Sequence, residues 1–210
     1  EDIDVDAITT AIIDSKFTAG RDLTLTTKEG MDIVNTTITT TGEGTATITA
    51  TNADFNGVIG DFAGDAVLEA VEFDATGITA DGDITVTSAE YIVNTNLISV
   101  NGGVTIESVK QIVDSVILAK SGEEGKGNVE ITATGEIDGT TITAGGDLTV
   151  SATYLAGDVL VSENGNINAT AENAIDATSM LAKAGAIDAA APAITGNSSF
   201  TAADYVAPTG

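Results

Sequence analysis

The sequence predicts an all-β fold, a single-stranded parallel β-solenoid of about ten coils with about 20 residues in each coil. We call each coil a rung. Two observations carry the prediction. A pattern of apolar residues recurs along most of the chain, and within each copy apolar and polar residues alternate with the period of two that is typical of strands. Thr, Ile and Val are abundant, and β-branched residues favour strands over helices.

The repeat is clearest in residues 137–154, "IDGTTITAGGDLTVSATY". Ile137 is followed by Ile142, then by a turn of small residues and by Leu148 and Val150. Gly, Asn, Asp and Ser supply the turns, as expected for tight connections. Copies of this pattern are expected to start at Ile12, Ile33, Phe73, Val93, Val113, Ile137, Leu155, Ile175 and Ile194.

The copy that starts at Val93 keeps the template, and its inward residues are expected to be Val93 and Ile98. Three other copies depart from it. The copy from Ile33 carries "TTGEGT" before Ile48. The copy from Val113 carries the insertion "SGEEGKGN" before Val129. The gap between Ile33 and Phe73 fits one degenerate copy within "ADFNGVIGDFAGDAVLEA".

The whole chain, residues 1–210, is expected to form one solenoid domain. Residues 1–11 form an N-terminal edge strand, residues 12–193 form the rungs, and residues 194–210 form a C-terminal edge rung. The hydrophobic fraction of 42% is too high for a disordered acidic chain. The inward side chains should stack into aliphatic columns, while Thr, Asp, Glu and Ser face water.

The net charge of −25 excludes several partners. A nucleic-acid binder needs Lys and Arg to neutralise phosphates, and an anionic membrane surface would repel this chain. No apolar stretch approaches the ~20 residues that span a bilayer. Cations are the natural small partners, and no cofactor is expected. Asp2, Asp4 and Asp6 lie on one face of the predicted first strand and are weak candidates for Ca²⁺ ligands; the alternative is a solvated strand face.

The chain contains no His and no Cys, so the usual base of a hydrolytic triad is missing. Paired carboxylates could serve glycoside hydrolysis. However, Asp147 of "AGGD" and Asp83 of "DGD" have a simpler interpretation as turn residues that bond to their own backbone. Strand rather than helix follows Gly146, so "TAGGDLTV" is not expected to bind an anion at a helix N-terminus. The sequence predicts a protein that is not an enzyme.

The segments "ITAGGDLTVSA", "FTAGRDLTLTT" and "ITADGDITVTS" resemble the repeats of filamentous haemagglutinin-type adhesins. The resemblance covers most of the chain. It implies a right-handed parallel β-helix carried by a secreted bacterial protein, and it implies no activity, because rungs of this kind are scaffolding. The chain begins at Glu1 rather than Met, which is expected of a processed, exported protein.

The two ends carry the functional prediction. A solenoid exposes an unpaired strand edge and an open core at each end unless a cap covers them, and no amphipathic capping helix is apparent at either terminus. The rod is therefore expected to associate head to tail with copies of itself, with "EDIDVD" as a strand that a neighbour could accept. The candidate interface residues are Ile3, Val5, Phe200, Tyr205 and Val206.

The functional hypothesis is that the protein is a non-catalytic subunit of a secreted, extracellular filament. The sequence leaves open whether this filament contacts a cell surface or matrix. The first alternative is a rod-like stalk fragment of a larger secreted adhesin. Two others are a cytoplasmic filament of the bactofilin type and an ice-binding protein. The last of these would need a regular Thr ladder, and Glu107, Glu130 and Asp188 interrupt the outward column that starts with Thr24 and Thr26.

Overall fold

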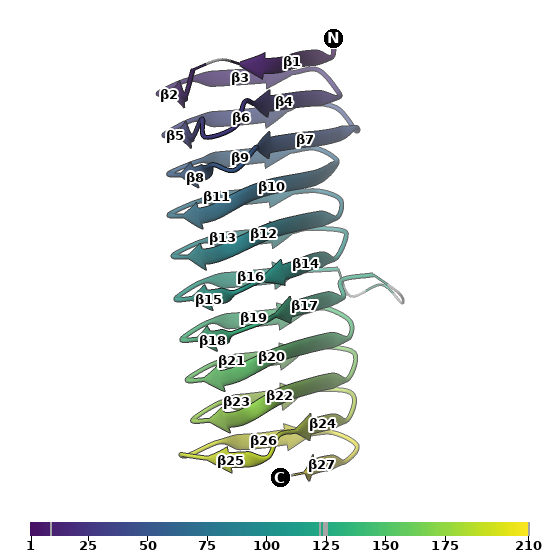
Figure 1. The fold of residues 1–210 in the computed structure, drawn as a ribbon. Helices are drawn as coiled ribbons and strands as arrows, with labels where there is room; N and C mark the ends of the chain where they lie inside the picture. The colour runs from purple at the N-terminus through teal and green to yellow at the C-terminus, as the bar shows by residue number, and fades with distance from the viewer. Residues whose placement is uncertain (9, 122, 124–125, 210) are drawn as a thin grey trace.

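The computed structural model describes residues 1–8, 10–121, 123 and 126–209, and over these ranges the protein is an all-β parallel solenoid of about ten turns. The fold class predicted from the sequence is confirmed. The molecule is a rod with its termini at opposite ends (Figure 1). As the chain descends, the strands in front run to the left and those behind run to the right, so the coil is right-handed (Figure 1).

Each rung has three straight segments, and over the described residues they form a 17-stranded and a 10-stranded sheet. The 17-stranded sheet bends into a long arm and a short arm. The strands that begin in the long arm are β1 (Ile3–Ile8), β4 (Leu23–Thr27), β7 (Thr45–Ala50), β10 (Asp65–Asp74), β12 (Ile84–Val93), β14 (Val104–Val109), β17 (Val129–Ala133), β20 (Leu148–Ala156), β22 (Ile167–Asp176), β24 (Ile187–Ala190) and β27 (Val206–Thr209).

The short arm follows the bend in each rung. It contains the C-terminal halves of β10, β12, β20 and β22, and the shorter strands β2 (Ile12–Ile13), β5 (Ile33–Val34), β8 (Asp54–Asn56), β15 (Gln111–Val113), β18 (Glu136–Asp138) and β25 (Ala193–Thr195). The 10-stranded sheet forms the third face, with strands β3 (Lys16–Ala19), β6 (Thr37–Thr40), β9 (Ile59–Phe62), β11 (Gly77–Ala80), β13 (Asn96–Ser99), β16 (Val116–Ala119), β19 (Thr141–Ala144), β21 (Val159–Ser162), β23 (Ser179–Ala182) and β26 (Ser199–Ala202).

Neighbouring rungs pair in parallel and in register, so equivalent residues form columns along the rod. Ile137, Ile142, Leu148 and Val150 are at most 1% exposed, which confirms the inward residues of the template rung. The degenerate rung is also confirmed, since β8 and β9 occupy the expected gap. The core is a set of aliphatic columns enclosed by the three faces.

The structure corrects the register of two rungs by one residue. Ile92 and Leu97 are buried, whereas Val93 and Ile98 are partly exposed. In the next rung Ile112 rather than Val113 is buried. Val93 and Ile98 are aliphatic and have the same spacing as Ile92 and Leu97. The apolar pattern alone therefore could not show which pair faces inward.

The corner between the short arm and the 10-stranded sheet fixes this register. One residue per described rung has a positive φ there, between 48° and 68°. This left-handed conformation is inexpensive for Gly, Asn and Asp and costs other residues about 1 kcal/mol or more. The column consists of Asp14, Asn35, Gly57, Ala75, Asn94, Asp114, Gly139, Gly157, Ala177 and Gly196.

A hydroxyl column follows the left-handed corner. Thr36, Thr95 and Thr140 are fully buried, and each donates a hydrogen bond from its hydroxyl to the carbonyl two residues earlier, at 2.9 to 3.2 Å. Ser115 does the same at 2.8 Å and accepts a bond from the Thr95 amide of the preceding rung at 3.1 Å. Thr and Ser therefore stabilise the corner by hydrogen bonds within a rung and between rungs.

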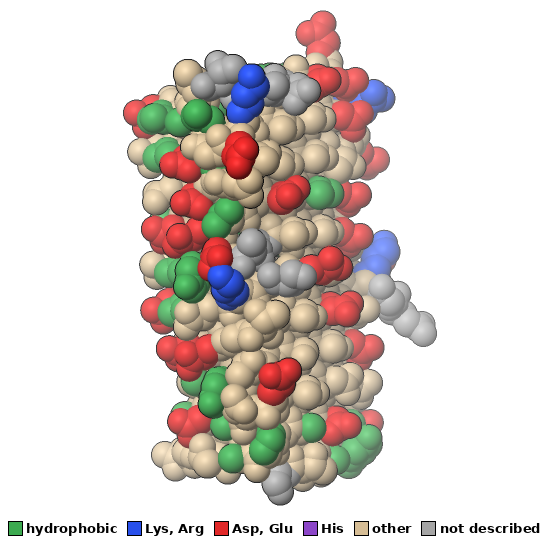
Figure 2. Space-filling view, viewed as in Figure 1, with side chains coloured by type: hydrophobic (Ala, Val, Ile, Leu, Met, Phe, Trp, Pro, Cys, Tyr) green, Lys and Arg blue, Asp and Glu red, His purple; other side chains and the backbone are tan. Residues whose placement is uncertain are grey.

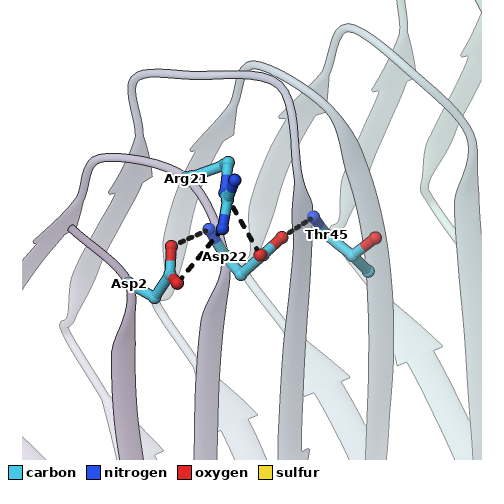
Figure 3. A network of polar contacts seen from close by, with 4 residues as sticks. All are labelled: Asp2, Arg21, Asp22 and Thr45. Carbon is cyan, nitrogen blue, oxygen red and sulfur yellow. Dashed lines mark hydrogen bonds and ion pairs between the residues drawn. The ribbon is translucent and has the colours of Figure 1, made fainter.

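A second polar column stands where each rung enters the long arm. In this Asx ladder, a side-chain Oδ1 accepts a bond from a backbone amide of the next rung. Asp65 bonds to the amide of Asp83 at 2.8 Å, and Asp147 bonds to that of Asn166 at 2.7 Å. The expectation that Asp83 and Asp147 bond to their own backbone is wrong, because Oδ1 of Asp83 likewise accepts the Gly103 amide of the next rung, at 2.7 Å. Figure 3 shows the N-terminal part of the ladder, where Asp22 bonds to the Thr45 amide at 3.1 Å.

One rung fills its core in reverse order. The 10-stranded sheet places a large residue second in each strand and a small residue fourth, as in Ile78 and Ala80. β9 instead has Gly60 second and Phe62 fourth. A Cβ on Gly60 would lie 2.7 Å from the Phe62 ring and 2.8 Å from Cδ1 of Ile78. The Phe62 ring thus occupies the volume that a side chain at position 60 would take.

We predict that Gly60→Ile and Phe62→Ala are each destabilising and compensate when combined. Phe62→Ala leaves a cavity and should cost about 3–5 kcal/mol, while Gly60→Ile overpacks the column and should cost at least about 1–3 kcal/mol. The double variant restores the usual large-then-small order. Urea unfolding of all four proteins measures the coupling, and purely additive losses would show that the two positions do not share one volume.

Candidate functional site

The hydrophobic core is open at both ends of the rod. Outside the fully buried cluster, the partly buried apolar side chains packed against it among the described residues are Ile3, Val5, Phe17, Ile194, Phe200 and Ala202. All of them belong to the first or the last rung. In the middle of the rod, the rungs on both sides cover each inward side chain. In the first and last rungs only one neighbouring rung covers it.

The N-terminal end presents free strand edges. β1 pairs with β4, and β3 pairs with β6. Over the described residues no strand pairs with the other edge of either. Unpaired backbone groups of this kind readily accept another strand. Ile3 and Val5 of β1 and Phe17 of β3 are the half-buried side chains at this end.

The C-terminal end presents the edges of β26 and β27, which pair with β23 and β24. Tyr205 and Val206 are 62% and 38% exposed. The amides of Ile187 and Ala191 donate to the carbonyls of Tyr205 and Thr209, so by alternation the free edge belongs to positions 206 and 208. Pro208 has no N–H, and it therefore removes one donor from that edge.

The structure places all five residues of the predicted interface at the ends: Ile3 and Val5 at one end, and Phe200, Tyr205 and Val206 at the other. Sequence reasoning missed Phe17 and Ile194. The signal was present in the repeat register, because Phe17 and Phe200 occupy the same column of the 10-stranded sheet, and Ile12 and Ile194 occupy the same column of the short arm.

The rungs do not end level with one another. Counted over the described residues, the long arm has eleven strands and the 10-stranded sheet has ten. β27 is the extra strand, one step beyond β24. If a second rod were stacked so that its β3 paired with β26, its β1 would need the position that β27 occupies. If β1 paired with β27 instead, β3 and β26 would be two strand spacings apart, about 4.8 Å too far to bond.

The structure describes the side chains of Asp2 and Asp4, two of the three candidate metal ligands. Asp2 lies beside Arg21, with an N–O distance of 3.3 Å, and it also accepts a bond from the Asp22 amide at 3.4 Å (Figure 3). Asp4 is exposed on β1, and the side chain of Asp6 lies outside the described residues. Within the described ranges no group of three or more acidic side chains is placed to hold a metal ion.

Acidic side chains gather along both lateral edges of the rod in the view of Figure 2. On the short arm, Asp54 and Glu72 are paired neighbours in adjacent rungs. Burial raises the pKa of Asp54, and the nearby Asp32 raises it further. Burial also raises the pKa of Glu72, followed by repulsion from Asp54 and Asp74. Burial is thus the main cause of both raised pKa values, and the like charges of adjacent rungs add to it.

The strongest perturbation belongs to Asp158, which stands in the hydroxyl column and is 1% exposed. Its Oδ1 accepts the Thr140 amide at 2.9 Å and its Oδ2 accepts the Ala156 amide at 3.0 Å. Burial raises the pKa of Asp158 to about 8, against the opposing effect of these two hydrogen bonds. A strongly shifted carboxyl in a cleft often marks catalysis, but Asp158 is enclosed and holds two rungs together.

A surface depression of about 580 Å³ lies beside the insertion. It is open to solvent, and its walls include Asp65, Asp83, Glu130 and Lys126. Oδ1 of Asp65 and of Asp83 each accept an amide from the next rung, so these carboxylates are committed to the Asx ladder. The hollow offers no arrangement that points to a particular reaction.

We predict that Asp158→Thr changes how stability depends on pH. The folded-state pKa is raised above the unfolded value, so this carboxyl stabilises the fold most below about pH 4, and the contribution is lost as the pH rises toward about 8. Replacement by the Thr typical of the column should remove that loss. Relative to the parent protein, the melting temperature of Asp158→Thr should rise by a few degrees between pH 5 and pH 9.

Asp188→Asn is the control, because it removes an exposed carboxyl from the long arm. Its melting temperature should keep the same offset from the parent across this range. A pH-independent offset for Asp158→Thr as well would show that Asp158 does not titrate with a raised pKa in the folded protein.

The described part of the chain has no helix long and apolar enough to cross a membrane. No protein-family model, no curated protein and no solved structure matches this chain. The evidence on function therefore comes from the fold and from the two ends of the rod.

Proposed function

We propose that this protein is a non-catalytic structural subunit that polymerises end to end into an extracellular filament. The observation that carries the proposal is the open core at both ends, where partly buried apolar residues occupy matching columns. Joining the ends would bury Ile3, Val5 and Phe17 of one subunit against the last rung of the next. It would also satisfy strand edges that are free in the single rod.

Such a contact joins two different surfaces. A head-to-tail interface that does not close on itself propagates into an open filament. The two ends of a long rod lie far from most of the chain's charge, so addition at an end brings few of the 32 acidic residues close to those of the neighbour. Cations in solution would lower the remaining repulsion.

The extracellular location rests on the resemblance of the repeats to filamentous haemagglutinin-type adhesins. The same resemblance supports a structural rather than a catalytic role. An alternative function is a stalk segment of a larger secreted adhesin, and the free edges of β1 and β27 support it equally well, because further rungs could continue from either edge.

Electron microscopy of purified protein, with and without Ca²⁺, tests the proposal. We expect unbranched filaments that lengthen with protein concentration. Val5→Glu at one end and Phe200→Glu at the other should each abolish them, because a charge would be buried at the joint. Thr149→Glu is the control: it adds the same charge at an exposed position beside Glu130 and should leave the filaments intact.

Mixing the two end variants tests the polarity of the joint. Val5→Glu retains an intact C-terminal end and Phe200→Glu an intact N-terminal end, so an equimolar mixture should form dimers and nothing longer. If microscopy shows either variant alone as rods of double length, joined at their ends, the contact joins like ends rather than head to tail. A protein that stays monomeric at high concentration, with or without Ca²⁺, would refute the filament.

The extra strand predicts an effect of truncation. If β1 of the incoming subunit must take the position of β27, deleting residues 206–210 should accelerate assembly and lower the concentration at which filaments appear. Light scattering over a concentration series measures both quantities. Slower assembly on deletion would show instead that β27, with Val206, is itself the surface on which the next subunit stacks.

A further inference from the structure

The outer face of the 10-stranded sheet differs in chemistry from the rest of the rod. In β11, β13 and β16 the first and third residues of the strand point outward, and the same holds along this sheet. The ten strands of this sheet all lie within the described ranges. Of the chain's 7 basic and 32 acidic residues, only Lys16 and Asp61 lie on this outer face.

Aliphatic and hydroxyl side chains make up most of this neutral face. Ile59 is 58% exposed, and Val116 and Val159 are about two-fifths exposed. Gly77 leaves a shallow hollow of about 510 Å³ between its neighbours Ile59 and Asn96. The aliphatic residues of the face are Ile59, Ile98, Val116, Leu118, Val159, Val161 and Leu181.

The other two faces carry acidic side chains in several rungs. The outward positions of the long arm include Glu69, Glu107 and Glu130. The short arm carries Asp54 and Glu72 together with Glu136. A second copy brought against either of these faces would set carboxylates opposite carboxylates.

We propose that the neutral face binds the neutral face of a second copy of this chain, sheet against sheet. Charge selects this occupant. A foreign partner of an acidic protein would gain most from the acidic edges and arms, whereas two rods of net charge −25 can approach closely only where neither carries charge. The equal strand spacing of the two sheets also lets their side-chain rows interdigitate along the whole contact.

The size of the face sets the strength of this pairing. Four residues across and ten strands along give a patch of about 13 by 48 Å, or roughly 600 Å² per copy. About 1,200 Å² in total lies at the lower limit for specific interfaces, so single rods pair weakly. In the proposed filament, successive rods extend the face, and many weak contacts then act together. This second step rests on the proposed function; the pairing of single rods does not.

The test uses Phe200→Glu as the background, so that end-to-end assembly cannot contribute. Sedimentation equilibrium over protein and salt concentration should show a monomer–dimer equilibrium that strengthens as salt screens the acidic charge. Adding Val116→Glu and Val159→Glu should weaken dimerisation at least tenfold. The matched control adds Thr105→Glu and Thr149→Glu, the same charge on the long arm of the same two rungs, and should leave most of the dimer.

Chemical cross-linking gives a second readout, because the native chain contains no Cys. Leu118→Cys in the neutral face should be joined across the dimer by a short bis-maleimide, and Thr105→Cys should not. Monomer at every protein and salt concentration overturns the proposal, and so does a dimer that the face variant and the control weaken equally. Neither result bears on end-to-end assembly, which is scored in the parent protein by microscopy.

Discussion

The parallel backbone ladder between rungs is the constraint on which the rest of the structure depends. A single rung cannot bury its inward side chains, because each of its faces is one strand thick, and only the rungs above and below complete the enclosure. Every column follows from this requirement. The aliphatic columns, the left-handed corners and the Asx ladder all repeat because each rung must present the same surface that it receives. At the ends the requirement is not met, and Phe17 and Phe200 are left half-covered.

The same constraint explains what could be predicted from the sequence. The alternation around Leu148 and Val150 and its recurrence gave the fold class, the number of rungs and the inward residues of most copies. The register of the rungs near Ile92 and Ile112 was missed, because Val93 and Val113 are also aliphatic and have the same spacing. The left-handed residue before a buried Thr or Ser would have settled it, since that pair of positions tolerates few residue types.

The candidate site was only partly predictable for a related reason. The hydrophobic residues near each terminus could be identified from the sequence, but the partner of Asp147 and the overhang of β27 depend on which rungs are adjacent and how many strands each face holds. The neutral face required the inward and outward positions of ten short strands to be assigned without error. In a four-residue strand, such as Val116–Ala119, aliphatic side chains lie on both sides.

The direction of the inter-rung hydrogen bonds has a mechanical consequence. The ladders and the Asx bonds all point along the axis of the rod, so a pull on the two ends loads every bond between a given pair of rungs at the same time. No strand can peel away before its neighbours on the other faces also yield. A rod of this kind would stretch very little and then fail abruptly at its weakest junction. In a chain of such rods that junction would be the joint between subunits, where the overhang of β27 keeps the long arm and the 10-stranded sheet from pairing at the same time. Such a filament would part between subunits and leave each one folded.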